Sequence, residues 1–247
     1  MHTYTPKELY LDKKTILVTG AGDGIGKQAA LHYAKYGATV ILLGKTVAKL
    51  ESVYDEIITN GGNEPAIVPL DLRGATEKHY RGMASTINDQ FGCLDGLLHN
   101  ASVLGHLGPF AQISEQDWQN VFQVNVTSQF LMTQALLPAL KKAPNSSVIF
   151  TTSSVGLQGR AYWGPYSISK FATQGMMQIL ADEYDNSSIR FNCVNPGATK
   201  TAMRAKAFPA ENAGDLKTPE EIMSLYLYLM DQQTSIENGQ TLDAQPK

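Results

Sequence analysis

Cysteine is scarce in this sequence of 247 residues. Cys93 and Cys193 are its only two cysteines, and neither belongs to a Cys-x-x-Cys pattern or to a Cys/His cluster. A secreted scaffold held by disulfides carries more cysteines, and so does a cysteine-ligated metal centre. We therefore expect two reduced thiols in a cytoplasmic protein, and no bound metal.

Charge of one sign and long apolar runs are lacking as well. The 20 lysines and arginines against 23 aspartates and glutamates give a formal net charge of −3, which is too mild and too well mixed for a surface that binds nucleic acid. No apolar run approaches the ~18 residues that a membrane span needs. The first residues lack the basic and then apolar layout of a signal peptide. We expect a soluble protein that binds neither nucleic acid nor membrane.

The sequence does contain a regular alternation of two kinds of segment. Short runs that are apolar on both faces, as buried parallel strands are, alternate with longer segments of helical periodicity. The predicted strands lie at 16–18, 40–43, 67–68, 97–98, 148–150 and 191–194. The predicted helices lie at 25–36, 47–59, 76–91, 115–142 with a break near Asn125, 166–184 and 219–230. This order predicts one α/β domain over residues 1–247, a doubly wound (Rossmann) parallel sheet with helices on both faces.

The first predicted strand runs into a glycine-rich loop that opens a helix, Thr19-Gly20-Ala21-Gly22-Asp23-Gly24-Ile25-Gly26. Glycine permits positive φ and lets a phosphate approach the backbone, and the N-terminus of a helix attracts anions. The position of this loop at the start of an alternating chain predicts a dinucleotide site. An ordinary glycine-rich turn is the alternative, because the spacing differs from the Gly-x-Gly-x-x-Gly of the commonest dinucleotide folds.

The end of the second predicted strand bears on the choice of cofactor. An NAD site has an acidic residue there, which accepts hydrogen bonds from the ribose hydroxyls. This chain has no acid at that point, and instead Gly44 leaves room and Lys45 supplies a cation. The pattern favours NADP(H) over NAD(H). A solvated lysine at the start of a helix is the alternative interpretation of Lys45.

Tyr166 and Lys170 are the best candidates for acid–base chemistry. They are four residues apart on a predicted helix, so their side chains share one face. The loop before them leaves the carboxyl end of a buried strand, where ligands of open α/β sheets bind. A nearby cation favours the phenolate and brings the pKa of a tyrosine closer to neutrality. Ser153 in that loop is placed to hydrogen-bond a substrate oxygen.

Taken in order, these motifs resemble the short-chain dehydrogenase/reductase family over nearly the whole chain. The matching positions are Thr19-Gly20-x-x-x-Gly24-x-Gly26, Asp71, Asn100-Ala101, Asn125, Ser153, Tyr166-x-x-x-Lys170 and Pro196-Gly197. The segments 171–184 and 242–246 further resemble the bacterial YciK-type branch of this family. Three positions depart from the family pattern. His99 and Ser102 replace the first Asn and the Gly of its Asn-Asn-Ala-Gly, and Asp23 stands where many NADP-dependent members have a basic residue.

The resemblance implies a catalytic set and a cofactor cradle. Tyr166 would donate the proton, and Lys170 would lower its pKa and contact the nicotinamide ribose. Ser153 would orient the substrate oxygen, and Asn125 would anchor a water relay behind Lys170. The implied cofactor-binding residues are Thr19, Gly20, Gly22, Asp23, Gly24, Ile25, Gly26, Gly44, Lys45, Asp71, Leu72, Asn100, Ala101, Ser102, Tyr166, Lys170, Pro196, Gly197, Thr199 and Thr201.

The expected function is the NADPH-dependent reduction of a ketone or aldehyde by hydride transfer, reversible as alcohol oxidation. Two alternatives remain, a 3-oxoacyl-[acyl carrier protein] reductase and a catalytically idle NADP(H)-binding scaffold protein. We expect a partly helical lid near residues 200–215, which with residues 104–113 would select the small-molecule substrate. Because the helices at 115–142 and 166–184 carry more apolar surface than one sheet face covers, and because such helices pair in this family, we expect a homodimer or homotetramer.

Overall fold

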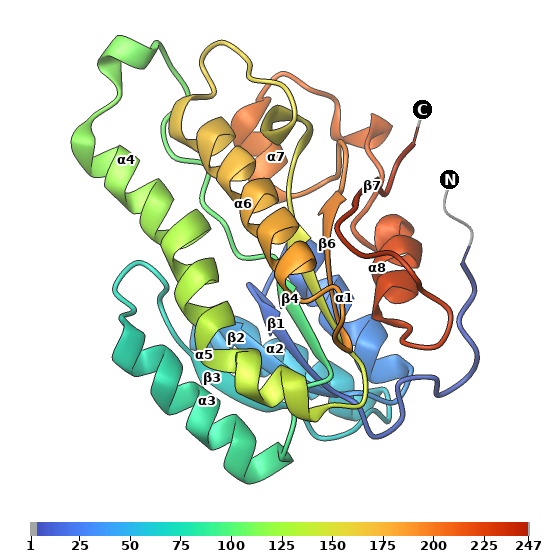
Figure 1. The fold of residues 1–247 in the computed structure, drawn as a ribbon. Coiled ribbons are helices and arrows are strands. Elements are labelled where there is room, and N and C mark those ends of the chain that lie inside the picture. Colours follow the sequence, from blue (N-terminus) through green and yellow to red (C-terminus); the bar gives the residue numbers. More distant parts are fainter. Residues whose placement is uncertain (1–3, 247) are drawn as a thin grey trace.

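Seven parallel strands form the sheet at the centre of the molecule (Figure 1). The computed structural model describes residues 4–246, so residues 1–3 and 247 of the predicted domain lie outside the described part. The strands are β1 (Thr15–Thr19), β2 (Thr39–Gly44), β3 (Ala66–Pro69), β4 (Gly96–His99), β5 (Ser146–Thr151), β6 (Ile189–Asn195) and β7 (Thr241–Asp243). Their order in the sheet is β3-β2-β1-β4-β5-β6-β7. The chain winds outward from β1 in both directions, which confirms the predicted doubly wound fold.

Strand β7 is the one strand that the sequence analysis missed. It has three residues, none of them buried, and it pairs with β6 at the edge of the sheet. A half-covered edge strand of this length has no apolar run on both faces, which was the signal used to predict the other six. All six predicted strands lie within β1 to β6.

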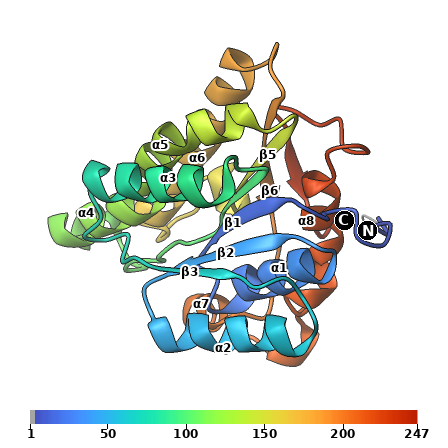
Figure 2. The same cartoon turned by 90° about the horizontal axis from the view of Figure 1, so that it is seen from below.

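Helices cover both faces of the sheet, as predicted. They are α1 (Gly24–Lys35), α2 (Val47–Thr59), α3 (Glu77–Phe91), α4 (Glu115–Phe122), α5 (Ser128–Lys142), α6 (Gly164–Glu183), α7 (Ala202–Ala207) and α8 (Met223–Met230). Buried side chains of α1, α2 and α8 form the core on one face, and those of α3, α5 and α6 form the core on the other, so the sheet lies between two helical layers (Figure 2). None of the helices within residues 4–246 combines the length and the apolar character that crossing a membrane requires.

The break predicted near Asn125 is a π-helical turn, Gln123–Thr127, between α4 and α5. A π-turn inserts one extra residue into a helix and often marks a functional site. Asn125 is fully buried within it. Its side-chain oxygen accepts a hydrogen bond from the Val103 N–H at 2.8 Å, and its side-chain nitrogen donates to the Val103 carbonyl at 2.9 Å. The irregular turn is thereby fastened to the chain that follows β4.

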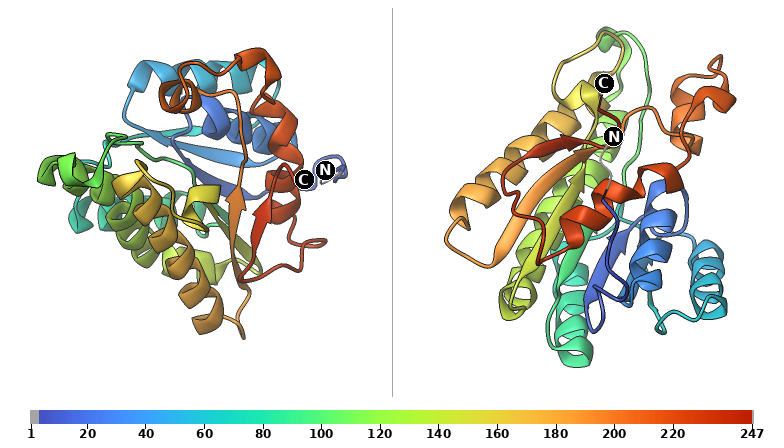
Figure 3. Two further views of the ribbon diagram at one scale, coloured as in Figure 1. Left: turned by 90° about the horizontal axis from the view of Figure 1, so that it is seen from above. Right: turned by 90° about the vertical axis from the view of Figure 1, so that its right-hand side faces the viewer.

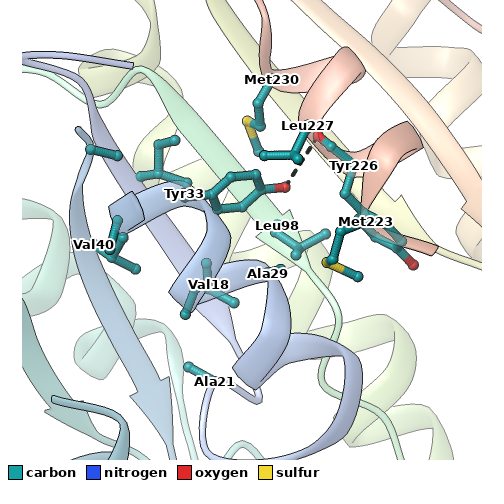
Figure 4. Close-up of a cluster of buried hydrophobic side chains, with 14 of the residues drawn as sticks. Val18, Ala21, Ala29, Tyr33, Val40, Leu98, Met223, Tyr226, Leu227 and Met230 are labelled. Atoms are coloured by element: carbon teal, nitrogen blue, oxygen red, sulfur yellow. Dashed lines mark hydrogen bonds between the residues drawn. The ribbon is translucent and has the colours of Figure 1, made fainter. Parts of the chain in front are cut away.

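A core of aliphatic and aromatic side chains fixes α1 against the sheet and α8 (Figure 4). Tyr33 of α1 and Tyr226 of α8 are both completely buried, and the Tyr33 hydroxyl donates to the Tyr226 carbonyl at 3.4 Å. Val18 of β1 and Leu98 of β4 contribute to the same core. Burial of this kind contributes about 1.5–3 kcal/mol per large side chain. It therefore holds the N-terminus of α1 rigidly beside the carboxyl end of β1.

The carboxyl ends of β1 and β4 are joined by one hydroxyl group. Thr19 is 1% exposed, and its hydroxyl donates to the Leu98 carbonyl at 3.2 Å. The same oxygen accepts hydrogen bonds from the Asn100 N–H at 2.9 Å and the Ala101 N–H at 3.0 Å. Figure 3 (left) shows this edge of the sheet from above. Thr19 thus fixes the spacing between the first loop and the loop after β4.

We predict that Thr19→Val lowers the free energy of unfolding by about 1–3 kcal/mol, because valine keeps the shape and leaves two N–H groups unpaired. Urea denaturation measures the change. Thr59→Val, at the exposed end of α2, is the matched control and should stay within about 0.5 kcal/mol of the wild type. Equal losses in the two variants would contradict the assigned role of the Thr19 hydroxyl.

Candidate active site

Two adjoining cavities lie at the carboxyl ends of the strands, one on each side of the loop between β1 and α1. The first has a volume of about 370 Å³ and the second about 290 Å³. Gly20, Asp23, Ala101 and Ser102 line both of them. Together they form an elongated site at the edge where open α/β sheets bind ligands. No three or more His, Cys, Asp or Glu side chains of residues 4–246 gather into a group that would hold a metal ion.

The structure brings most of the predicted site residues to these cavities. In the first are Gly20, Asp23, Gly24, Ile25, Asn100, Ala101, Ser102, Ser153, Tyr166, Lys170, Pro196, Gly197, Thr199 and Thr201. In the second are Gly20, Gly22, Asp23, Gly44, Lys45, Asp71, Leu72, Ala101 and Ser102. Thr19, Gly26 and Asn125 are in neither lining and lie behind the cavity walls. For these three residues the hydrogen bonds and packing indicate a positioning role, and direct contact with the cofactor stays a prediction.

The loop between β1 and α1 has the shape that a pyrophosphate requires. Gly20 has φ +68°, which residues with a side chain rarely adopt. A Cβ on Gly26 would overlap the Gly20 carbonyl oxygen, so the first turn of α1 packs against the loop with no space for a side chain. The backbone N–H groups of that turn have no partner within the helix. A dinucleotide phosphate therefore fits over the loop, at the N-terminus of α1.

The second cavity has more positive than negative side chains free of an ion pair. Asp23 begins α1 by accepting a hydrogen bond from the Gly24 N–H, and it forms an ion pair with Lys49. The hydrogen bond from Lys49 lowers the pKa of the Asp23 carboxyl. Among residues 4–246, no ion pair involves Lys45 or Arg73, which both line this cavity. Pairing with Lys49 thus offsets the acidic residue that opposed the NADP(H) prediction.

Arg73 and Lys49 are site residues that the sequence analysis missed. Arg73 follows β3 by a few residues, and its N–H donates to the Asp71 carboxylate at 3.0 Å. Lys49 lies in the first turns of α2, one turn beyond Lys45. Both are basic residues shortly after a strand that ends at this edge. That spacing was a usable signal, because the carboxyl ends of neighbouring parallel strands meet there.

Tyr166, Lys170 and Ser153 meet in the first cavity. Tyr166 and Lys170 lie on the first turns of α6, and Ser153 follows β5. Burial raises the pKa of Tyr166 to about 12, and a hydrogen bond with the Ser153 side chain acts in the opposite direction. The neighbouring Ser154 is exposed and outside the lining. The structure therefore places Ser153, the serine named by the family resemblance, beside the phenol.

The Lys170 ammonium group is fully buried beside Tyr166. It donates to the Thr151 carbonyl at 2.7 Å and lies 5.5 Å from the centre of the Tyr166 ring. Burial lowers the pKa of Lys170 to about 8. The group is therefore mostly protonated at pH 7, and its charge acts on the phenol through a medium from which water is excluded.

Asn125 reaches this pair through one hydrogen-bond chain. Its side-chain nitrogen donates to the Ser169 hydroxyl at 3.0 Å, and that hydroxyl donates to the Tyr166 carbonyl at 2.7 Å. The π-turn thereby fixes the first turns of α6. The water relay that the family resemblance implies for Asn125 stays a prediction.

Two further residues beside the first cavity carried no functional prediction. Thr152 is 1% exposed and lines the cavity, and its hydroxyl has no hydrogen-bond partner within the described residues. The Gln245 side chain donates to the Pro196 carbonyl at 2.9 Å and to the Ala198 carbonyl at 3.0 Å. It thereby holds the loop 196–199 from behind. Sequence alone gave no signal for Gln245, because it acts from the far end of the chain.

His99, which departs from the family pattern, has structural contacts. Its ring stacks on Phe150 with centroids 4.8 Å apart, and its Nε2 forms a hydrogen bond of 2.8 Å with the Thr133 hydroxyl. Burial lowers the pKa of His99 to about 3, so the ring is neutral at pH 7. It lines neither cavity.

Comparison with known proteins agrees with this geometry. Residues 14–212 match the short chain dehydrogenase family. The chain is 52% identical over 246 residues to "Uncharacterized oxidoreductase YciK" of Escherichia coli K12, with 100% of this chain and 97% of that protein covered. A short chain dehydrogenase of Shigella flexneri crystallised with NADP is 52% identical, with a TM-score of 0.95 over 97% of this chain and 100% of that one.

A short chain dehydrogenase of Escherichia coli CFT073 crystallised with NADPH is also 52% identical, with a TM-score of 0.95 over 98% of this chain and 100% of that one. The match extends over the whole domain and includes the sheet, both helical layers and the edge that holds the two cavities. The family resemblance inferred from the motifs is thus confirmed: the chain is an oxidoreductase that belongs to the short chain dehydrogenase family.

Proposed function

We propose that this chain is an NADPH-dependent reductase of small ketones or aldehydes, acting reversibly on the corresponding alcohols. The observation that carries the proposal is the meeting of Tyr166, Lys170 and Ser153 in a cavity that continues into a phosphate-binding loop. These are the groups that a carbonyl reduction needs from the protein, since they supply a proton, a fixed positive charge and a hydrogen bond to the reacting oxygen.

The raised pKa of Tyr166 supports a role as proton donor. Burial keeps the Tyr166 phenol protonated at pH 7, so it can donate to the oxygen of a carbonyl substrate. The phenolate that remains is stabilised by the Lys170 ammonium group, whose pKa of about 8 keeps it mostly charged at pH 7. The Ser153 hydroxyl orients the substrate oxygen toward the phenol. When bound, NADPH supplies the hydride.

The cavity linings support NADP(H) as the cofactor. The first loop fits a pyrophosphate, and Lys45 and Arg73 face the cavity where the adenosine end would lie. A 2′-phosphate carries most of two negative charges at pH 7, which these cations would offset. NADP(H) is also the cofactor in the two related crystal structures. We assign the second cavity to the adenosine end and the first to the nicotinamide and the substrate.

The segment 200–217 is the proposed lid. It leaves the sheet edge and returns to it, and a bridge between Thr199 and Lys217 closes its base. It contains α7 and a 3-10 turn at Ala213–Asp215, so it is partly helical as expected. Met203, Ala207 and Phe208 of this segment line the first cavity. The meeting of Tyr166, Lys170 and Ser153 in one cavity favours an enzyme over an idle scaffold.

A homodimer or homotetramer remains part of the proposal. Apolar side chains lie exposed along α5 and α6, namely Phe130, Ile168, Phe171 and Ile179, with exposed fractions of 49%, 37%, 44% and 60%. A Cβ on Gly175 in α6 would meet no atom within 4 Å, so this position leaves room for a second helix to approach. Pairing of α5 and α6 across a two-fold axis would bury these side chains.

We also propose a cytoplasmic location, because Cys93 and Cys193 are both free.

We predict that Tyr166→Phe lowers kcat for any accepted carbonyl substrate by about 10²- to 10⁴-fold while NADPH binding stays near that of the wild type. The ring remains and only the proton donor is lost. NADPH oxidation with a panel of ketones and aldehydes gives kcat, and a fluorescence titration gives cofactor affinity. Tyr54→Phe on α2 removes a hydroxyl that bonds Glu64 and should leave both quantities unchanged. Normal turnover in Tyr166→Phe would remove this residue from the mechanism.

We predict that Lys45→Ala raises the Michaelis constant for NADPH about 10- to 100-fold and leaves that for NADH nearly unchanged, since a charge-assisted hydrogen bond to the phosphate is lost. Gly44→Asp should add a preference for NADH, although its Cβ would lie 3.1 Å from the Leu50 Cδ2 and Leu50 must shift. Lys78→Ala on the exposed side of α3 is the control. Equal affinity of the wild type for NADH and NADPH at low salt would refute the assignment.

We predict that light scattering at micromolar concentration gives two or four times the chain mass of 26.9 kDa. Gly175→Glu should shift the particle toward the monomer, because it places a charge where the helices would meet. Gly82→Glu on α3 is the matched control, since a Cβ there also meets no atom within 4 Å, and it should leave the mass unchanged. A wild-type particle of one chain would show that α5 and α6 are not an interface.

A further inference from the structure

One wall of the first cavity is a row of aromatic rings that begins at Tyr166 and ends in an ion pair. The ring centres of Tyr166 and Trp163 are 5.9 Å apart, and those of Trp163 and Phe208 are 5.6 Å apart. The guanidinium carbon of Arg204 lies 3.7 Å from the centre of the Phe208 ring. The row therefore runs without interruption from the proposed proton donor to the segment 200–217.

Glu211 holds Arg204 in this position. The Arg204 Nε donates to one carboxylate oxygen of Glu211 at 2.6 Å, and its Nη2 donates to the other oxygen at 2.5 Å. This bidentate geometry is the one that a substrate carboxylate would adopt on an arginine. Glu211 occupies the edge of the Arg204 guanidinium, and Phe208 covers the face of that group. The positive charge of Arg204 is therefore neutralised within the segment 200–217.

The other cation of this cavity is also engaged, because Lys170 is fully buried and donates to the Thr151 carbonyl. The remaining walls near the aromatic row are apolar, formed by Leu104, Met203 and Ala207. A carboxylate entering here would lose its hydration and meet no free cation among the described residues that line this cavity. A flat apolar ring would instead gain offset or edge-on contacts with Trp163 and Phe208.

We propose that the first cavity selects uncharged carbonyl compounds that carry an aromatic ring, which packs against Trp163 and Phe208, while the Arg204–Glu211 pair leaves no free cation for an anionic substrate. The proposal rests on the proposed reductase function and names its substrate class. The substrate shares the volume of about 370 Å³ with the nicotinamide. Phe208 and Glu211 are the specificity-determining residues, and neither touches the reacting oxygen.

The test compares benzaldehyde, para-carboxybenzaldehyde and hexanal as substrates with NADPH. We expect kcat/KM for benzaldehyde to exceed the values for the other two by about tenfold. Phe208→Leu should remove most of the advantage of benzaldehyde over hexanal, about 3- to 10-fold, chiefly through KM. Retention of that advantage in Phe208→Leu, or a wild-type preference for para-carboxybenzaldehyde, would overturn the proposal.

Glu211→Gln provides the sharper test, because it keeps Arg204 and removes the carboxylate charge that neutralises it. Turnover of para-carboxybenzaldehyde should rise about tenfold relative to benzaldehyde, and the added change Arg204→Met should abolish that gain. Arg81→Met is the matched control, since Arg81 belongs to an exposed Glu77–Arg81 pair on α3, and it should alter none of the three ratios. No gain in Glu211→Gln would overturn the role of the ion pair.

A binding measurement separates this proposal from the proposed function. Trp118 and Trp163 are the only tryptophans of the sequence, so the Trp118→Phe protein reports on Trp163 alone. With NADP⁺ present, benzaldehyde should quench this fluorescence at a concentration about tenfold lower than hexanal does. Such quenching without reduction of any carbonyl would refute the reductase function and support the ring-binding site. Reduction of all three substrates with equal efficiency and no preferential quenching would support the reductase function and refute the ring-binding site.

Discussion

A buried ammonium group needs a hydrogen-bond acceptor, and in this fold that requirement determines where α6 lies. Lys170 is removed from water, and its nearest acceptor is the Thr151 carbonyl at the last residue of β5. A charge left without a partner at such depth costs several kcal/mol, far more than any single surface contact contributes. The first turns of α6 are therefore fixed at the carboxyl edge of the sheet. Tyr166 lies one turn earlier on the same face of α6, so its side chain lies in the wall of the cavity.

The same edge is shaped by contacts that have no catalytic chemistry of their own. Thr19 joins β1 to the chain after β4, Asn125 joins the π-turn to Val103 and Ser169, and Gln245 supports the loop 196–199. Each is a polar side chain that satisfies backbone groups which would otherwise be unpaired. Hydrogen bonds to the main chain thus hold the segments that form the cavity walls. The side chains that line the cavities remain free to contact a ligand.

Most of the fold could be predicted from sequence because buried parallel strands are apolar on both faces. Edge strand β7 could not, since a strand of three half-exposed residues has no such pattern. The proposed catalytic set was predicted through spacing, because a helix places residues four apart on one face and a strand end places Ser153 nearby. Arg73, Lys49 and Gln245 were missed, because their contributions to the site depend on which loops meet in space. The ion pair with Lys49 also offsets the negative charge of Asp23, which had counted against NADP(H). Such a pair cannot be recognised from a sequence pattern, because its partners are far apart along the chain.

The π-turn at Gln123–Thr127 determines where the long helix formed by α4 and α5 can change in length. An α-helix closes its hydrogen bonds over four residues and a π-turn closes them over five, so the turn accommodates one additional residue and leaves the helix on either side in nearly the same phase. The contacts of α4 with α6 and of α5 with α3 are therefore compatible with the additional residue. An insertion or deletion elsewhere in this helix would rotate one half by about 100° relative to its neighbour. A change of length is therefore tolerated within this turn and excluded from the rest of the helix.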